Sequence, residues 1–393
     1  MAMMMKRYVD ELLKPFTQHY MDNNTMVGTW WHQLSAIFWR PDIWLPPGVE
    51  WKDMESSDEL HYPSFHDVCV YSLMLSMVIF NLYHFCLRPL VLEPLAQLAA
   101  IPNKRPRPPL PSKTLLEIYL RCGKKPSEEE LLKASDSTGM SIRQMERWLR
   151  CYHAITHSTK HEKFIDCGFH LICHCFLTIF GCFIMFHKPW LWNILLCWEN
   201  YPYHSIDDDV WWYYIIGLSY FGAATILQIQ APGRSVGDKV HMMLHHLFTV
   251  FLMVFSWTCN FVRVGTLVLL VHEFADIPLL SAKMFTYAGI TAPRNGLFAV
   301  FLITWVITRC YLFPFWIIYS VYMDSAPLTG MPVAQVMKVV LCGLLVLNII
   351  WTVLIGRVLM RKLYSGSLED VRSDDEDLSD DSEETTFDRV KDE

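Results

Sequence analysis

Seven apolar stretches, separated by shorter polar segments, dominate the pattern of the sequence. Each has about 18 residues or more, enough for an α-helix rising ~1.5 Å per residue to cross a hydrocarbon core about 30 Å thick. The stretches cover residues 68–87, 164–186, 210–227, 240–257, 262–280, 297–322 and 333–359. The pattern therefore predicts an all-α, polytopic membrane protein with about seven transmembrane helices.

The composition supports this class. Apolar residues make up 52% of the chain and charged residues only 19%, against roughly a quarter charged in soluble domains. An ordinary soluble enzyme is therefore excluded. Charged and polar residues occupy the first 25 positions, where a cleavable signal peptide would need an apolar run, so no such peptide is expected.

The charges predict an orientation in the membrane. The net charge of −7 hides an acidic tail, because residues 366–393 hold 13 acidic and 3 basic side chains. Residues 103–163 carry 13 Lys or Arg against 7 Asp or Glu, whereas residues 1–67 carry 5 against 10. The positive-inside rule places the basic segment in the cytosol. With seven spans, the amino terminus is then lumenal and the acidic tail cytosolic.

Five segments follow from these patterns: a lumenal aromatic segment (1–67), a first transmembrane helix (68–95), a cytosolic segment (103–156), a six-span catalytic region (164–362) and a disordered acidic tail (366–393). Asn23 lies in a glycosylation sequon on the predicted lumenal side. Ser373, Ser379 and Ser382 lie among acidic residues of the tail, a pattern typical of sites for acidophilic kinases.

The cytosolic segment resembles the last two helices of a homeodomain. Ser127 begins a capped helix, Gly139 supplies a turn, and Trp148 is the core aromatic residue of a helix like the recognition helix. Cys151 stands where homeodomains keep the Asn that reads adenine. The first helix and its basic arm are expected to be absent. DNA binding is therefore unexpected, and a basic module at the membrane surface is favoured.

The most informative polar residues lie at 241–283, in the fourth and fifth apolar stretches. Ionisable residues inside membrane spans are costly and commonly mark a functional site. If these spans form a hairpin that turns near Asn260, His245 lies at the same depth as Asp276, and His246 at the depth of His272. These groups then converge in the membrane. The alternative is that each histidine is a core residue that bonds between helices.

This block resembles the signature HHxxTxxLxxxSWxxNFxRxGxLVxxxHDxxDxxLExAK of the ceramide synthases, a family of TLC-domain membrane proteins. The matching residues are His245, His246, Thr249, Ser256, Trp257, Asn260, Phe261, Arg263, Gly265, Leu267, His272, Asp276, Leu279, Ala282 and Lys283. Glu273 replaces the family's Asp, Leu280 replaces its Glu, and Pro278 interrupts the fifth span. The aromatic segment, the homeodomain-like segment and the tail also have counterparts. The resemblance implies that the last six spans form the TLC helical bundle.

The resemblance implies the transfer of a fatty acyl group from acyl-CoA to the amine of a sphingoid base. Thioester-to-amide conversion is downhill, so no cofactor and no metal are expected. A neutral imidazole can act as the base or as the nucleophile. His245 is assigned to acyl transfer and His246 to a partner role, although the reverse assignment stays open. The predicted catalytic residues are His245, His246, His272 and Asp276, supported by Glu273, Thr249, Asn260, Arg263, Arg309 and Lys283.

Acyl-chain selectivity in this family tracks the short lumenal loop between the last two spans. Here it comprises Tyr322, Met323, Asp324, Ser325, Ala326, Pro327, Leu328, Thr329, Gly330, Met331 and Pro332. Its composition gives no chain length. The resemblance also implies the endoplasmic reticulum membrane as location, acyl-CoA and a sphingoid base as partners, and a homodimer or a heterodimer with related synthases.

Two other functions remain open from the sequence. His241, His245 and His246 form an HxxxHH pattern like a diiron box of membrane desaturases and hydroxylases, and His170 and His174 are also one helical turn apart. That interpretation leaves Asp276 and the block around Asn260 unexplained. The third possibility is a catalytically silent, lipid-sensing protein, in which the departures at 273 and 280 have ended catalysis.

Overall fold

The computed structural model describes residues 33–57, 60–103, 105–230, 236–325, 328 and 330–365, and within these ranges the regular elements are all helices. This confirms the all-α fold. The predicted glycosylation site at Asn23 and the predicted phosphorylation sites at Ser373, Ser379 and Ser382 lie outside the described residues.

Seven helical segments are long and apolar enough to cross a membrane. They are Asp67–Leu98, Ile142–Met185, Asp208–Gln230, Val240–Thr258, Val262–Tyr287, Thr291–Met323 and Pro332–Tyr364. Each contains most or all of one predicted span. The second segment is in fact two helices, because the chain leaves helical conformation between α8 (Ile142–Thr156) and α9 (Lys160–Met185). All seven predicted spans are therefore confirmed.

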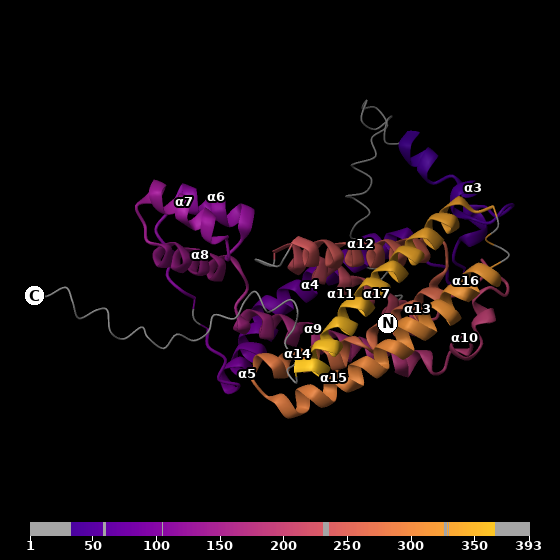
Figure 1. Ribbon diagram of the computed structural model, residues 1–393. Helices are drawn as coiled ribbons and strands as arrows, with labels where there is room; N and C mark the ends of the chain where they lie inside the picture. The colour runs from indigo at the N-terminus through magenta and orange to yellow at the C-terminus, as the bar shows by residue number, and fades with distance from the viewer. Residues whose placement is uncertain are drawn as a thin grey trace, which may run out of the picture.

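The spans pack into one elongated body (Figure 1). Its main helices are α4 (Ser72–Leu82), α9, α11 (Asp208–Gln230), α12 (Val236–Thr258), α13 (Val262–Glu273), α14 (Asp276–Tyr287), α15 (Thr291–Trp305) and α17 (Pro332–Ser365). The α14 helix packs between α9 and α15, and α12 packs against α11 and α17. The first span lies against α11, where the Ser76 hydroxyl donates to the Ser219 carbonyl at 2.9 Å.

The fifth span is broken near its middle, as the proline predicts. Helix α13 ends at Glu273 and α14 begins at Asp276, with Phe274 and Ala275 in a turn between them. Pro278 lies in the first turn of α14, where the missing N–H of proline removes no helical hydrogen bond. The break lies among the predicted catalytic residues.

Two spans contain π-helical segments that the hydrophobic pattern did not predict. The short η2 (Asp67–Tyr71) begins the first span. Two longer segments each contain a proline: η3 (Tyr83–Leu92) contains Pro89 and η5 (Val306–Ile318) contains Pro314. A proline inside an α-helix removes a hydrogen bond and clashes with the preceding turn, and a wider turn accommodates both effects. The η5 segment carries the predicted site residue Arg309.

A glycine allows three central helices to approach closely. A β-carbon on Gly265 of α13 would lie only 2.7 Å from the hydroxyl oxygen of Tyr214 on α11. That hydroxyl is hydrogen-bonded to the Ser256 hydroxyl of α12. Small residues commonly permit such contacts between membrane helices. The serine and glycine of the signature block therefore serve helix packing here.

The loop that joins α9 to α11 is anchored by a buried lysine. The ammonium group of Lys188 donates to Asp207 at 2.7 Å and to Asp209 at 2.8 Å. Burial favours the neutral amine, but the two carboxylates outweigh that effect and raise the pKa of Lys188. Asp207 and Asp209 thus fix the conformation of this loop through Lys188.

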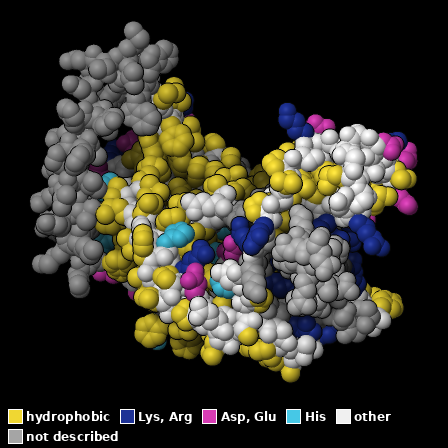
Figure 2. Space-filling view, turned by 90° about the vertical axis from the view of Figure 1, so that its left-hand side faces the viewer, with side chains coloured by type: hydrophobic (Ala, Val, Ile, Leu, Met, Phe, Trp, Pro, Cys, Tyr) yellow, Lys and Arg dark blue, Asp and Glu magenta, His cyan; other side chains and the backbone are white. Residues whose placement is uncertain are grey.

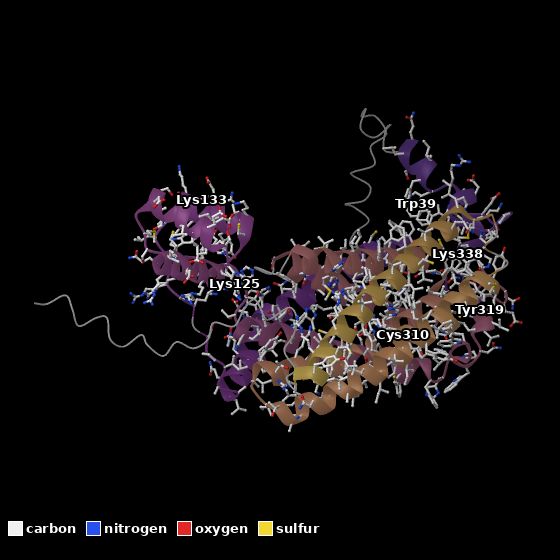
Figure 3. All side chains as sticks on the ribbon, in the orientation of Figure 1. Trp39, Lys125, Lys133, Cys310, Tyr319 and Lys338 are labelled. Atoms are coloured by element: carbon white, nitrogen blue, oxygen red, sulfur yellow. The ribbon has the colours of Figure 1, made fainter. Side chains whose placement is uncertain are left out.

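The homeodomain-like segment has three helices, which corrects the expectation of two. They are α6 (Lys113–Cys122), α7 (Glu128–Thr138) and α8. Their shared core consists of Leu115, Ile118, Leu131, Ala134, Met145, Trp148 and Leu149. Figures 1 and 3 show the unit beside the body, with Lys125 and Lys133 far from Trp39 and Lys338 at the opposite end. Helix α6 begins at Lys113, directly after a proline-rich stretch of the sequence.

Candidate active site

A cavity of about 720 Å³ runs through the body between α9, α11, α12, α13, α14, η5 and α17. This size is within the range of small-molecule sites. One end, called the basic mouth below, is lined by His153, His157, Lys163, Lys283 and Arg294. The other end, called the loop end, is lined by Trp198, Val321, Leu328 and Ala334. Figure 2 faces the side of the mouth and shows histidine, basic and acidic side chains gathered between hydrophobic ones.

Most of the predicted site residues line this single cavity. They are His245, His246, Thr249, His272, Glu273, Asp276, Lys283 and Arg309, from four different helical segments. The predicted turn near Asn260 is present, since α12 ends at Thr258 and α13 begins at Val262. The matched depths of the two helices therefore bring the polar groups together as predicted.

The adjacent histidines of α12 face different neighbours. His245 packs edge-on against Trp351 of α17, with ring centroids 5.2 Å apart. His246 faces Phe221 of α11 at 6.4 Å. Consecutive helical residues point about 100° apart, so the two imidazoles contact different walls of the cavity. Nδ1 of His245 is buried and has no hydrogen-bond partner among the described residues.

His272 is held in one tautomer by the backbone. Its Nδ1 lies 2.8 Å from the Val268 carbonyl oxygen, which can only accept, so Nδ1 carries the proton. The ring also packs against Phe313 with centroids 4.6 Å apart. Nε2 is buried and bonds to none of the residues that the structure describes. When the ring is neutral, Nε2 is the nitrogen without a proton, and it is suited to accept one.

Arg309 joins the two halves of the broken fifth span. Its guanidinium donates to the His272 carbonyl at 2.6 Å and to the Asp276 carboxylate at 3.1 Å. It also donates to the Asn348 side chain at 3.4 Å and lies over the Trp305 ring at 5.2 Å. Only 3% of the arginine side chain is exposed. The guanidinium therefore pairs with a carboxylate and fixes Asp276 beside the end of α13.

Two predicted supporting residues lie outside the cavity lining, which corrects their expected place in the site. Asn260, in left-handed conformation at φ 56°, donates to the carbonyls of Pro202 and His204 at 2.7 and 2.8 Å. Arg263 donates to the Leu196 carbonyl at 2.7 Å and lies 5.0 Å from the Trp190 ring centroid. Both residues hold the α9–α11 loop, because buried carbonyls need donors.

The predicted selectivity loop reaches the cavity at one point. Leu328 is 3% exposed and lines the loop end. Met331 is buried below it and contacts the Tyr201 hydroxyl through sulfur at 3.9 Å. Ala326, Pro327 and Thr329 lie outside the described residues. Among the described loop residues, Leu328 lines the cavity, and Val321, which precedes the loop on α16 (Tyr319–Met323), lines it as well.

Comparison with known proteins identifies the family. The TLC-domain model matches residues 163–357. Human ceramide synthase 3 is 31% identical over 343 residues, which cover 86% of this chain and 88% of that protein. This chain belongs to the ceramide synthase family. Bovine ceramide synthase 4 is 28% identical over 354 residues, 88% of each chain, and the Caenorhabditis elegans ceramide synthase hyl-1 is 34% identical over 226 residues, 54% of this chain and 61% of that protein. The resemblance inferred from the sequence is thereby confirmed.

The two departures from the ceramide synthase signature both line the cavity. Glu273 is only 1% exposed, and its carboxylate lies 2.5 Å from Nδ1 of His174. The longer side chain is thus anchored to α9. Leu280 replaces a carboxylate with an apolar wall. Neither change removes the histidines or Asp276 from the site.

Sequence reasoning missed the contribution of α9 and α11. His170 and His174 were noted only as part of a diiron pattern, and Tyr220 was not singled out, yet all three line the cavity of this ceramide synthase family member. Asp166, His170 and His174 recur every four residues and so share one face of α9. Three polar residues at that spacing inside an apolar span were the available signal.

The diiron alternative gains no support from the geometry. Within the described ranges, no three His, Cys, Asp or Glu side chains are grouped so as to hold a metal ion. Family membership favours acyl transfer instead. The catalytically silent alternative is likewise favoured by no observation, since the four predicted catalytic residues all reach the cavity.

Proposed function

We propose that this protein is an acyl-CoA-dependent sphingoid base N-acyltransferase whose reaction takes place in the cavity. Membership of the ceramide synthase family supports the activity. The observation that carries the site assignment is the tautomer of His272, which presents a basic nitrogen to the same cavity as His245. No cofactor is needed, because acyl transfer from a thioester to an amine is downhill.

The proposed acyl transfer has two steps. The imidazole of His245 attacks the thioester, the C–S bond breaks, and the imidazole proton goes to the CoA sulfur through His272 as acid–base. The neutral amine of the sphingoid base then attacks the acyl-imidazole, forms the amide and returns one proton to His245. Each step conserves protons between amine, histidine and thiol. His246 and Thr249 line the wall beside the acyl group.

Two ends of the cavity suit two ends of acyl-CoA. The basic mouth places the ammonium of Lys283 and the guanidinium of Arg294 where the CoA phosphates would lie, and basic side chains bind phosphates well. The remaining wall toward the loop end is largely apolar and accommodates the acyl chain. We therefore place CoA on the cytosolic side, which follows the predicted orientation with a lumenal amino terminus and a cytosolic carboxyl terminus.

Leu328 is proposed to set the acyl-chain length. Leu328→Ala lengthens the loop end and is expected to shift the preferred acyl-CoA upward by about two carbons, whereas Leu328→Phe shifts it downward. Burial of one CH₂ contributes about 0.8 kcal/mol, so kcat/KM for the longer substrate changes about four-fold per methylene. A panel of acyl-CoAs of graded length measures the shift.

Leu252→Ala is the matched control for that panel. Leu252 lines the cavity from α12 and is not part of the loop that contains Leu328. The variant is expected to change kcat/KM by the same factor for every acyl-CoA, with no shift in the preferred chain length. An unchanged preference in both Leu328 variants contradicts the role of the loop end.

The activity is tested with the purified full chain in detergent or vesicles. Sphinganine and long-chain acyl-CoA are expected to yield one N-acyl product per CoA released. CoA release without amide formation, across the whole acyl-CoA panel, contradicts the proposed function. We further propose residence in the endoplasmic reticulum membrane and assembly into dimers, on the basis of the family alone.

A further inference from the structure

Five polar side chains from three helices form a continuous chain of contacts along the cavity wall. The Glu273 carboxylate meets Nδ1 of His174 at 2.5 Å, and Nε2 of His174 meets the Tyr220 hydroxyl at 3.0 Å. The same hydroxyl meets Nδ1 of His170 at 2.8 Å, and Nε2 of His170 lies 3.5 Å from the Asp166 carboxylate. All five residues line the cavity. The helix α9 supplies three of them, which extend over about 12 Å of its axis.

The chain runs from the buried site toward the basic mouth. The Glu273 side chain is 1% exposed and that of His174 10%, whereas His170 is 20% and Asp166 34% exposed. At the buried end, Oε1 of Glu273 has no hydrogen-bond partner within the described part of the chain. The inner carboxylate thus has an oxygen available for the cavity, and the outer carboxylate is accessible to water.

The acyl transfer proposed above produces one proton that these groups must remove. A sphingoid base enters from water mainly as an ammonium ion, but only the neutral amine attacks an acyl group. Of the two protons that the ammonium loses, one replaces the acyl group on sulfur as the CoA thiol and the other is left over. A stranded proton in a low-dielectric cavity is costly.

We propose that Glu273 takes the proton of the incoming ammonium and that His174, Tyr220 and His170 relay it to Asp166 at the basic mouth. The proposal rests on the acyl transfer described above. The inner carboxylate first pairs with the ammonium, which orients the amine toward His245. Glu273 contacts substrate, whereas the other four residues act through it.

The three hydrogen bonds and the His170–Asp166 contact can take two opposite donor directions, which differ by one proton moved from end to end. The His170–Asp166 contact, at 3.5 Å, must shorten when it transfers the proton. With Glu273 protonated, each donor points outward: Glu273 to His174, His174 to Tyr220, Tyr220 to His170, and His170 to the Asp166 carboxylate. With the proton on Asp166, each bond is reversed. To pass from one state to the other, one proton moves across each contact, so that at each contact one bond to hydrogen breaks and one forms. Each imidazole and the tyrosine hydroxyl are neutral in both states. Each imidazole and the hydroxyl can both donate and accept, as this requires.

Other ionisable groups face the relay from every helix packed against it. They are Tyr83 and Arg88 from η3, Cys173 from α9, Tyr213 from α11, His245 from α12, Asp276 from α14 and Arg309 from η5. The Tyr220 hydroxyl is hydrogen-bonded to both His174 and His170. Tyr220 therefore provides the link between the two imidazoles.

The test compares two tyrosines of the same helix. Tyr220→Phe removes the linking hydroxyl, and Tyr213→Phe removes a buried hydroxyl that bonds to none of the described residues. At neutral pH we expect Tyr220→Phe to lower kcat for N-acylation of sphinganine about ten-fold, less than the ~10² loss for an acid–base group, with KM unchanged. Tyr213→Phe is expected to match the parent protein.

Two further readouts separate proton transfer from a structural role. The kcat defect of Tyr220→Phe is expected to shrink toward the parent value as the pH rises toward the pKa of the substrate amine, because an amine that enters neutral has no proton to export. His170→Ala provides the second variant, and added imidazole is expected to restore its kcat. The relay is overturned if Tyr220→Phe has no kcat defect, if its defect is constant with pH, or if Tyr213→Phe has an equal defect. It is also overturned if imidazole does not restore the kcat of His170→Ala. Absence of N-acylation by the parent protein would instead contradict the proposed function.

Discussion

Replacing His245 with alanine is expected to abolish N-acylation, with a loss in kcat of at least about 10². His245 lines the same cavity as His272, and its buried Nδ1 bonds to none of the described residues. Alanine removes both the acyl acceptor and its proton. The measurement is initial-rate formation of N-acyl product from sphinganine and acyl-CoA, together with the thermal midpoint of each purified variant.

His241→Ala is the matched control for His245→Ala. His241 lies one turn earlier on α12, near the basic mouth, and also lines the cavity. The same substitution there is expected to weaken acyl-CoA binding at most, with kcat preserved. If His245→Ala kept more than about a tenth of the parent activity, the acyl-transfer role of His245 would be wrong, because an acid–base group contributes about 10² or more.

Replacing Arg309 with leucine is expected to destabilise the fold strongly. The arginine is buried, pairs with Asp276 and caps the carbonyl at the end of α13. Removing one partner of a buried ion pair costs about 3 to 5 kcal/mol. We expect the lower end of this range, because the Asp276 side chain is 27% exposed and solvent screens part of its charge. For a chain of this length, a loss of about 3 kcal/mol lowers the thermal midpoint by roughly 4 °C, measured by thermal unfolding in detergent.

The double variant Arg309→Leu/Asp276→Leu separates two causes of the destabilisation: the unpaired charge of Asp276 and the lost packing of the arginine side chain. Removing the carboxylate together with its partner is expected to recover part of the thermal midpoint without recovering activity. Arg357→Leu, an exposed arginine on α17, is the control and is expected to leave the midpoint unchanged. If the single and double variants had equal midpoints, the Arg309–Asp276 pair would not be the source of the destabilisation.

The parts of the fold set by local patterns were predictable from the sequence. The lengths of the apolar stretches predicted the seven long helices, and Pro278 predicted an interruption of the fifth span. His245, His272 and Asp276 were predictable as neighbours, because both helices of the hairpin rise by the same amount per residue and residues equally far from the turn lie at similar depth. These predictions depend only on spacing along adjacent spans.

Contacts between distant spans were not predictable in this way. The pairing of His174 with Glu273 joins residues 99 positions apart, and rotation of α9 about its axis decides whether it forms. The same holds for Asn260, whose polar side chain looked like part of the site but bonds to loop carbonyls. Periodicity predicts which residues share one face of a helix, whereas the helix that this face contacts depends on the packing of the whole bundle.

The most direct test of the proposed mechanism is the mass of the intact protein after incubation with acyl-CoA alone. The account predicts a mass increase of one acyl group, located on the peptide that contains His245 and missing in His245→Ala. Adding sphinganine is expected to remove the adduct and to yield an equal amount of N-acyl product. Rapid CoA release and amide formation with no adduct, or an adduct located on another peptide, would contradict acyl transfer through His245.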